Sequence, residues 1–351
     1  MDILVLGGTG FISSHLVRKL SKQNYKVTVF NRGKSRPCIK LPDNIEIING
    51  DRDNEEDLIN LMQGRKFDVA YDMIAYLPQQ SLMAIDVFKG KIGRFIHCST
   101  VSVYMVSNNV QCPVTEDQDQ KELMDYFPRN SFGMNYGINK RDCEKILKKA
   151  HHPDDFPVTI MRPTFVSGPG DPTMRDWFWI ERILDGQQLL VPGSGDYAFQ
   201  QIYVKDVANA FAQVIEKEDT IGKAYNVASE EIYTLNTYLK KLGKLLDKTP
   251  EIVHIDQAMF DKLPVSQSRA GDVFPFNTRR TAVFSLEKIK KDLNFHSTSF
   301  NKWMKATIDW YRKRRSSSSI GYDKRDREIK LAQIWKKKYN STMKDIYAKF
   351  K

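Results

Sequence analysis

A tight glycine turn near the start of the chain is the feature that most constrains its fold. Residues 3–6 form a short apolar run, typical of a buried parallel strand, and the pattern Gly7-x-x-Gly10-x-x-Ser13 follows at once. Apolar residues then recur at helical spacing. Glycines let phosphates approach the backbone, and a helix N-terminus offers free N–H groups. A plain strand, turn and helix is the alternative, but this placement favours a pyrophosphate site, which a small serine in place of the third glycine still permits.

Strands and helices alternate beyond this turn, at the spacing of βαβ units. This alternation predicts an α/β protein with a Rossmann doubly wound parallel sheet and a smaller C-terminal substrate lobe. After Arg162-Pro163 the composition changes to loops rich in glycine and proline around an aromatic helix. The expected strands cover 26–30, 45–48, 67–74, 94–98 and 158–161, and the expected helices 57–62, 140–149, 177–184 and 328–339.

The domain organisation follows from these changes in composition. We expect a cofactor-binding domain at 1–165 with returning segments near 198–228, a substrate lobe at 166–311 and a basic tail at 312–351. The tail holds 14 Lys/Arg and 4 Asp/Glu, so nearly all of the net charge of +11 lies there. Leu331, Ile334 and Trp335 share one side of the tail helix, which we expect to pack on the body or on a partner.

Several classes of protein are excluded by what the sequence lacks. It shows no signal peptide and no apolar run long enough for a membrane span, so we expect a cytoplasmic protein with no membrane partner. The four cysteines show no paired metal-ligand spacing and are expected to be reduced thiols. The histidines lie on unrelated elements, and no metal site is expected.

The end of the second strand carries the residues that select a cofactor. An acidic side chain there would accept hydrogen bonds from the ribose hydroxyls of NAD. This chain has Asn31-Arg32 instead, with Lys34 and Arg36 nearby. A guanidinium suits a 2′-phosphate, so NADP is favoured, with NAD as the alternative. Asp51, after the third strand, is placed to meet the adenine amino group.

A tyrosine and a lysine four residues apart predict acid–base chemistry. Tyr136 and Lys140 share one helix face, and a nearby ammonium is expected to lower the pKa of the phenol from its usual value of about 10. Such a tyrosine can remove a proton from an alcohol or donate one to a ketone. Ser99 and Thr100 end the fifth strand at the edge where open α/β sheets bind ligands, and Thr100 would hydrogen-bond the reacting oxygen.

Taken together, these motifs make the chain resemble the extended short-chain dehydrogenases, that is, the NAD-dependent epimerase/dehydratase family, of which UDP-galactose 4-epimerase is a member. The resemblance covers residues 1 to about 310. It rests on the opening Gly7-Gly8-Thr9-Gly10-Phe11-Ile12, Gly50-Asp51, Ser99-Thr100 with Val103-Tyr104, Tyr136 with Lys140 and Glu144, Met161-Arg162-Pro163, Gly168-Pro169, 202–208 and 269–272.

The resemblance implies a set of functional residues, with hydride moving to or from a nicotinamide. Its catalytic residues would be Thr100, Tyr136 and Lys140. Its substrate contacts would be Thr100, Phe199 and Arg269. Its cofactor contacts would be Gly7, Thr9, Gly10, Phe11, Ile12, Asn31, Arg32, Asp51, Arg52, Ala75, Tyr136, Lys140 and Pro163. Members of this family often dimerise, so a homodimer is expected.

Two departures from the family pattern bear on the substrate. Val101 and Ser102 stand where 4,6-dehydratases carry Asp-Glu, which disfavours that elimination chemistry. Nucleotide-sugar epimerases grip the diphosphate with two arginines, and here Arg269 matches one while Phe199 replaces the other. A sugar or nucleotide-sugar substrate is therefore expected, but with one charge-assisted contact fewer.

Three functions remain open at this stage. The first is a sugar or nucleotide-sugar epimerase that holds NAD(P), and the second is an NADPH-dependent reductase of a ketone on a non-nucleotide substrate, which Arg32 favours. The third is a non-catalytic cofactor-binding protein with a protein or nucleic-acid partner. Because Thr100, Tyr136 and Lys140 are all present, catalysis is favoured and nucleic acid is not the expected partner.

Overall fold

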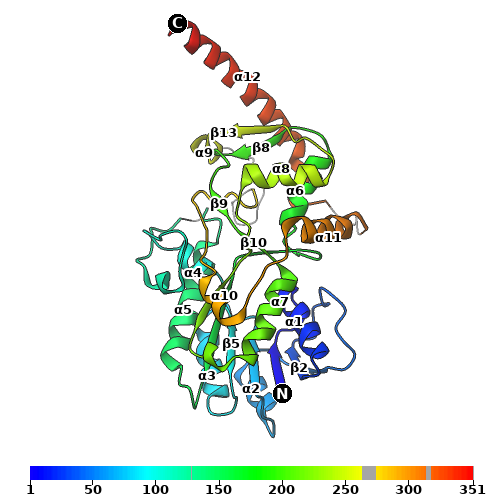
Figure 1. Ribbon diagram of the computed structural model, residues 1–351, viewed down its shortest axis with the longest axis vertical. Coiled ribbons are helices and arrows are strands. Elements are labelled where there is room, and N and C mark those ends of the chain that lie inside the picture. The colour runs from blue at the N-terminus through cyan, green and yellow to red at the C-terminus, as the bar shows by residue number, and fades with distance from the viewer. Residues whose placement is uncertain (128, 263–273, 314–317, 351) are drawn as a thin grey trace.

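The computed structural model describes residues 1–127, 129–262, 274–313 and 318–350. Its lower half in Figure 1 holds a large parallel sheet between helices, and its upper half a smaller lobe. The α-helices are α1 (Phe11–Lys22), α2 (Glu55–Met62), α3 (Pro78–Phe88), α4 (Ser102–Met105), α5 (Met134–Ala150), α6 (Arg175–Leu184), α7 (Val204–Gln213), α8 (Leu235–Leu245), α9 (Gln257–Phe260), α10 (Glu287–Leu293), α11 (Phe300–Lys313) and α12 (Arg325–Lys349).

Seven parallel strands form the main sheet, in the order β11-β6-β5-β4-β1-β2-β3. This order confirms the predicted Rossmann fold, since the chain leaves β1 toward one edge and later crosses back to the other. The expected strand at 67–74 is shorter than predicted, because only four of its residues pair with β1. The strands are β1 (Asp2–Leu6), β2 (Lys26–Asn31), β3 (Glu46–Asn49), β4 (Val69–Asp72), β5 (Phe95–Cys98), β6 (Val158–Pro163) and β11 (Ala224–Val227).

Both faces of the sheet are covered, which explains the continuous apolar run of β1. Successive side chains of a strand point to opposite faces. Ile3 and Val5 accordingly join the hydrophobic cluster under α1 and α7, whereas Leu4 and Leu6 join the cluster under α2, α3 and α5. The first strand is thus buried at the centre of the sheet, and its carboxyl end delivers the glycine turn to the upper edge.

The smaller lobe is built from helices and short strand pairs around an aromatic core. Trp177, Phe178 and Trp179 of α6 are all buried there, and Trp177 stacks on Tyr311 at 5.0 Å between ring centroids. The helix predicted at 177–184 is thus confirmed. The short strands are β7 (Phe165–Ser167), β8 (Leu189–Pro192), β9 (Ala198–Phe199), β10 (Gln201–Tyr203), β12 (Tyr233–Thr234) and β13 (Ile252–Ile255). The domain boundaries at 165 and 311 stay a prediction.

The basic tail forms one long helix that is clamped to the lobe at its start. Glu328 of α12 pairs with the buried Arg182 of α6 at 2.7 Å, and Arg325 pairs with both Asp185 and Glu328. The Trp335 indole donates to the carbonyl of His254. The second half of α12 extends away from the body (Figure 1). The helix is longer than the predicted 328–339.

The predicted apolar side of the tail helix packs on the body in part. Leu331 and Trp335 pack on the core as expected, but Ile334 is exposed, because only the side of the helix that carries the ion pairs faces the lobe. In the part of the chain that the structure describes, none of the helices combines the length and the apolar character that crossing a bilayer demands.

A buried carboxyl on α6 makes the stability of the lobe depend on pH. Oδ1 of Asp176 accepts hydrogen bonds from Tyr238 at 2.8 Å and from Gln201 at 3.0 Å. Burial, with a smaller contribution from Asp171, raises the pKa of Asp176 from 3.8 to about 6. The folded protein therefore keeps this proton to a higher pH than the unfolded chain. Its stabilising effect is complete below pH 4 and is lost as the pH rises through 6.

The substitution Asp176→Asn should remove this pH dependence, because the amide does not titrate. Relative to the variant, the free energy of unfolding of the natural protein should fall by about 3 kcal/mol between pH 4 and pH 7. Urea unfolding curves at a series of pH values measure this difference. If the free energies of unfolding of the two proteins changed with pH in the same way, the assignment of this pH dependence to Asp176 would be contradicted.

Candidate active site

The glycine turn lies where β1 meets α1 and leaves no room for side chains. Gly7 has a φ of +107°, and a Cβ on Gly8 would lie 2.4 Å from a methyl group of Val29. Gly10 caps α1 without a side-chain hydrogen bond, so the first N–H groups of the helix remain available to a ligand. Ser13 is buried in the position expected for a third glycine, and the helix still packs against the sheet.

A cavity of about 400 Å³ opens beside this turn at the ends of β2 and β3. It brings together the predicted residues Gly7, Thr9, Gly10, Asn31, Arg32, Asp51 and Arg52, with Lys34 and Arg36. Arg32 lies 3.9 Å from Asp51, and both side chains are largely exposed. The Arg52 guanidinium is instead buried and bound to Asp72 at 2.5 Å. Arg52 thus supports β4, and its contact with a cofactor stays a prediction, since the residue also lines the cavity.

A second cavity, of about 490 Å³, continues from the first and shares Gly10, Ile74 and Tyr76 with it. Thr100, at the end of β5, and Tyr136, on the first turn of α5, both line it. The Thr100 hydroxyl donates to Ser102 at 3.1 Å. Phe11 and Ile12, two more predicted cofactor contacts, line the same cavity. The structure thus brings the predicted tyrosine and threonine to the wall of a space that begins at the glycine turn.

Lys140 lies beneath this cavity and is almost completely buried. Its Nζ donates to the carbonyl of Ala75 at 2.7 Å and to that of Cys98 at 2.5 Å. Ala75, a predicted cofactor contact, is buried and contributes here through its carbonyl. Burial lowers the pKa of Lys140. An ammonium has three N–H donors, so one remains for a further partner.

The expected effect of Lys140 on Tyr136 is not found. Burial raises the pKa of Tyr136, and the hydrogen bond from Thr100 and the charge of Arg175 oppose this rise only in part. The prediction of a lowered pKa is therefore wrong for this state of the protein. The physical reason is that the ammonium is directed to two backbone carbonyls, while the partly exposed phenol lies against protein that disfavours its charged form.

A network of buried charges holds the end of β5 in place. Ser99 donates to Glu144 of α5 at 2.5 Å, and Glu144 in turn accepts from Arg162 of β6 at 2.8 Å. Arg162 also bonds Tyr104 and Asp119. Because both charges are buried, each stays favourable only while the other is present. The network therefore fixes β5 and α5 relative to each other, and with them Thr100 and Tyr136.

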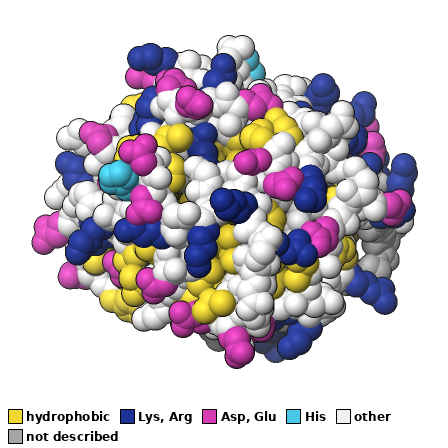
Figure 2. Space-filling view, turned by 90° about the horizontal axis from the view of Figure 1, so that it is seen from below, with side chains coloured by type: hydrophobic (Ala, Val, Ile, Leu, Met, Phe, Trp, Pro, Cys, Tyr) yellow, Lys and Arg dark blue, Asp and Glu magenta, His cyan; other side chains and the backbone are white. Residues whose placement is uncertain are grey.

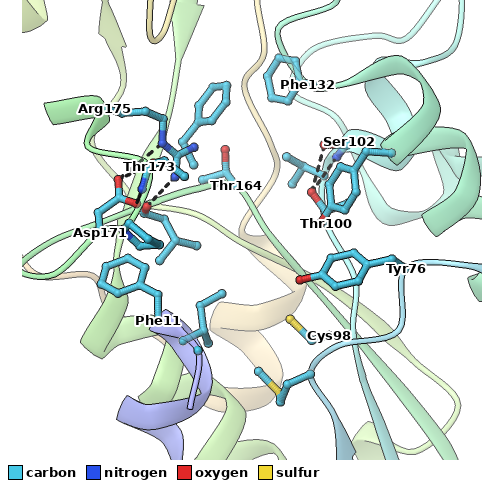
Figure 3. Close-up of a pocket in the computed structure, with 18 of the residues that line it drawn as sticks. Phe11, Tyr76, Cys98, Thr100, Ser102, Phe132, Thr164, Asp171, Thr173 and Arg175 are labelled. Carbon is cyan, nitrogen blue, oxygen red and sulfur yellow. Dashed lines mark hydrogen bonds and ion pairs between the residues drawn. The ribbon is translucent and has the colours of Figure 1, made fainter. Parts of the chain in front are cut away.

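The opposite wall of the cavity was not predicted from the sequence. Figure 3 shows Asp171, Thr173 and Arg175 facing Thr100 and Tyr76 across the opening. Arg175 lies 3.6 Å from Asp171 and donates to the carbonyl of Val166 at 2.9 Å. An arginine at the start of a helix, directly after the glycine- and proline-rich loop 168–172, is the signal that could have drawn attention to it.

Three remaining predictions fall elsewhere. Phe199 is fully buried and stacks on Phe276 at 5.3 Å within an aromatic cluster, so it has no surface for a substrate. It is a core residue, contrary to the prediction. Pro163 ends β6, and its carbonyl accepts from Val101, while its neighbour Thr164 lines the cavity. Arg269 lies outside the described residues.

The fold and the paired cavities define a Rossmann-type protein of the short-chain dehydrogenase class. A model of the NAD dependent epimerase/dehydratase family matches residues 3–82 and 82–228, and the chain belongs to this family. The chloroplast stem-loop binding protein of 41 kDa b from Arabidopsis thaliana is 28% identical over 84% of this chain and 74% of its own length. The UDP-N-acetyl-alpha-D-glucosaminuronate decarboxylase of Bacillus cytotoxicus is 27% identical over 88% of this chain and 97% of its own length.

Solved structures show the same fold. UDP-glucose 4-epimerase of Thermotoga maritima, crystallised with UDP-glucose, aligns with a TM-score of 0.69 at 23% identity, covering 90% of this chain and 100% of that one. dTDP-glucose 4,6-dehydratase of Bacillus anthracis, in complex with NAD, aligns with a TM-score of 0.68 at 21% identity, covering 91% and 98%. At these identities the likeness concerns the fold.

Proposed function

We propose that this protein is an NAD(P)-dependent enzyme that oxidises, reduces or epimerises a carbinol or keto carbon of a sugar or nucleotide sugar. Thr100, Tyr136 and Lys140 are its catalytic residues. The observation that carries the proposal is that Thr100 and Tyr136 line the wall of one cavity that adjoins the glycine turn. The bacterial decarboxylase relative and the epimerase solved with UDP-glucose support the substrate class.

The residues present fit a pyridine dinucleotide. The turn is closed to any Cβ at Gly8, and the N–H groups that open α1 are uncapped, as a pyrophosphate requires. When bound, the nicotinamide supplies the acceptor or donor of a hydride. The cluster of Arg32, Lys34 and Arg36 at the other end supports NADP over NAD.

The chain's own residues would manage the proton on the reacting oxygen. Thr100 donates a hydrogen bond to that oxygen, and Tyr136 removes its proton during oxidation or returns one during reduction. Lys140 has one N–H left for a ribose hydroxyl, while two carbonyls fix its position.

Replacing the phenol hydroxyl tests this chemistry. Tyr136→Phe should lower turnover by at least about a hundredfold, because the proton donor is lost while the ring is kept. Dinucleotide affinity, measured by titration calorimetry, should remain within about threefold. Turnover is followed through the absorbance of the reduced nicotinamide with a panel of nucleoside diphosphate sugars. Tyr126→Phe, at an exposed tyrosine outside the cavity, is the matched control.

A charge reversal at Arg32 tests the choice of cofactor. Arg32→Asp should weaken NADP by about tenfold or more, because it removes a charge-assisted contact and places a carboxylate near the phosphate. NAD should bind equally well or more tightly. Lys91→Asp, at an exposed position away from the cavity, is the control. Equal losses for NADP and NAD would show that Arg32 does not select the cofactor.

Arg175 supplies the positive charge of the substrate side. Phe199 is buried and does not line this cavity. Among the described residues that do, Arg175 carries the guanidinium, and it lies across the opening from Thr100 (Figure 3). We therefore assign it to an anionic group of the substrate, such as a diphosphate or carboxylate. Arg175→Gln should raise KM by about tenfold with kcat little changed, whereas Arg175→Lys should recover part of the affinity. This role would be contradicted if the substrate were a neutral sugar and Arg175→Gln left the KM for that sugar unchanged.

A second candidate function is of another class. The likeness to the Arabidopsis stem-loop binding protein favours a non-catalytic protein that binds a stem-loop. The retained Thr100 and Tyr136 favour the enzyme. A gel shift with an RNA hairpin at increasing salt separates the two, since binding through phosphates weakens steeply with salt. The homodimer and the cytoplasmic location stay predictions.

A further inference from the structure

A separate basic groove lies on the outer side of α1 and α7, the two helices that lie side by side over one face of the sheet (Figure 1). It encloses about 300 Å³. It has no lining residue in common with the two cavities of the candidate active site. Its lining residues are His15, Arg18, Lys19, Lys22, Lys205, Ala208 and Asn209.

The cations of this groove have no acidic partners among the described residues. None of Arg18, Lys19, Lys22 and Lys205 forms an ion pair there, whereas Lys26, which follows soon after α1, pairs with Asp2 at 3.2 Å. Residues 1–311 are nearly neutral overall, and Figure 2 shows cations and anions interspersed at the lower end of the molecule. Four cations without an acidic partner thus surround one hollow, and Lys205 among them contacts the Tyr203 ring.

His15 adds an unsatisfied polar atom to the same groove. Its Nε2 is buried and has no hydrogen-bond partner within the described protein. Burial, together with the charges of Lys205 and Arg18, lowers its pKa to about 4, so the ring is neutral at pH 7. A buried ring nitrogen without a partner costs free energy, and an oxygen of a bound ligand would remove that cost.

We propose that this groove binds a ligand that carries at least two linked phosphate groups. His15, Arg18 and Lys22 succeed one another along two turns of α1, over about 10 Å, and Lys205 faces them from α7. A row of this length exceeds what one phosphate needs and suits successive phosphates, each held by charge-assisted hydrogen bonds. The site is distinct from the cofactor and substrate cavities and does not depend on the function proposed above.

Titration calorimetry with tripolyphosphate tests the groove. The double variant Arg18→Glu/Lys22→Glu should weaken binding by at least about tenfold, because it replaces two attractive charges with repulsive ones. The control Lys91→Glu/Lys240→Glu makes the same change in net charge at exposed lysines elsewhere. The variant Arg32→Asp shows whether tripolyphosphate also binds at the cofactor site. It should weaken binding there and leave the affinity of the groove unchanged.

A single-stranded RNA of twelve nucleotides identifies the source of the phosphates. The ligand is a nucleic-acid backbone if the groove variant also binds the RNA more weakly. In that case the salt dependence of RNA binding should fall by about two released counterions. If only tripolyphosphate loses affinity, the ligand is a small polyphosphate compound. Equal binding of both probes by the groove variant and the control variant would overturn the proposal. Unaltered melting temperatures of both variants exclude unfolding as the cause.

Discussion

A single buried ammonium connects the parts of the site. Lys140 reaches from α5 to the carbonyls of Ala75 and Cys98, which follow β4 and end β5. Its charge is removed from water with no carboxylate in direct contact, so those two carbonyl dipoles must compensate much of the lost hydration. The arrangement holds only while the helix and both strand ends keep their spacing. The Arg162–Glu144 pair secures this spacing one turn further along the same face of α5.

Local sequence patterns determined the parts of the fold and site that could be predicted. The apolar run at 3–6, the glycine turn and the helical spacing of Tyr136 and Lys140 each depend on neighbouring residues, and the structure agrees with them. The pKa of Tyr136 could not be predicted this way, because its enclosure is built by residues distant in sequence. The burial of Phe199 likewise depends on Phe165, Tyr238 and Phe276, which come from separate elements.

The cavity wall opposite Thr100 and Tyr76 combines one cation with apolar side chains. Phe132 and Phe165 stack at 4.7 Å beside the opening, and the Arg175 guanidinium lies 5.5 Å from the Phe165 ring. Asp171 and the Val166 carbonyl direct this guanidinium before any ligand arrives, which reduces the entropy lost on binding. A ligand that joins an apolar face to an anionic group therefore complements this wall better than a fully hydrated sugar does.

The clamp between Arg182 and Glu328 makes the C-terminal helix an integral part of the lobe. Arg182 is 1% exposed, and its guanidinium also stacks on the Phe178 ring at 3.5 Å. If the chain were cut before α12, this charge would remain inside the lobe without its counterion, which is a severe defect in a protein interior. A polypeptide shortened at residue 324 would therefore lose solubility or cooperativity of folding, whereas one shortened at residue 340 would keep the whole anchor and lose a mostly exposed segment that includes Tyr347 and Phe350.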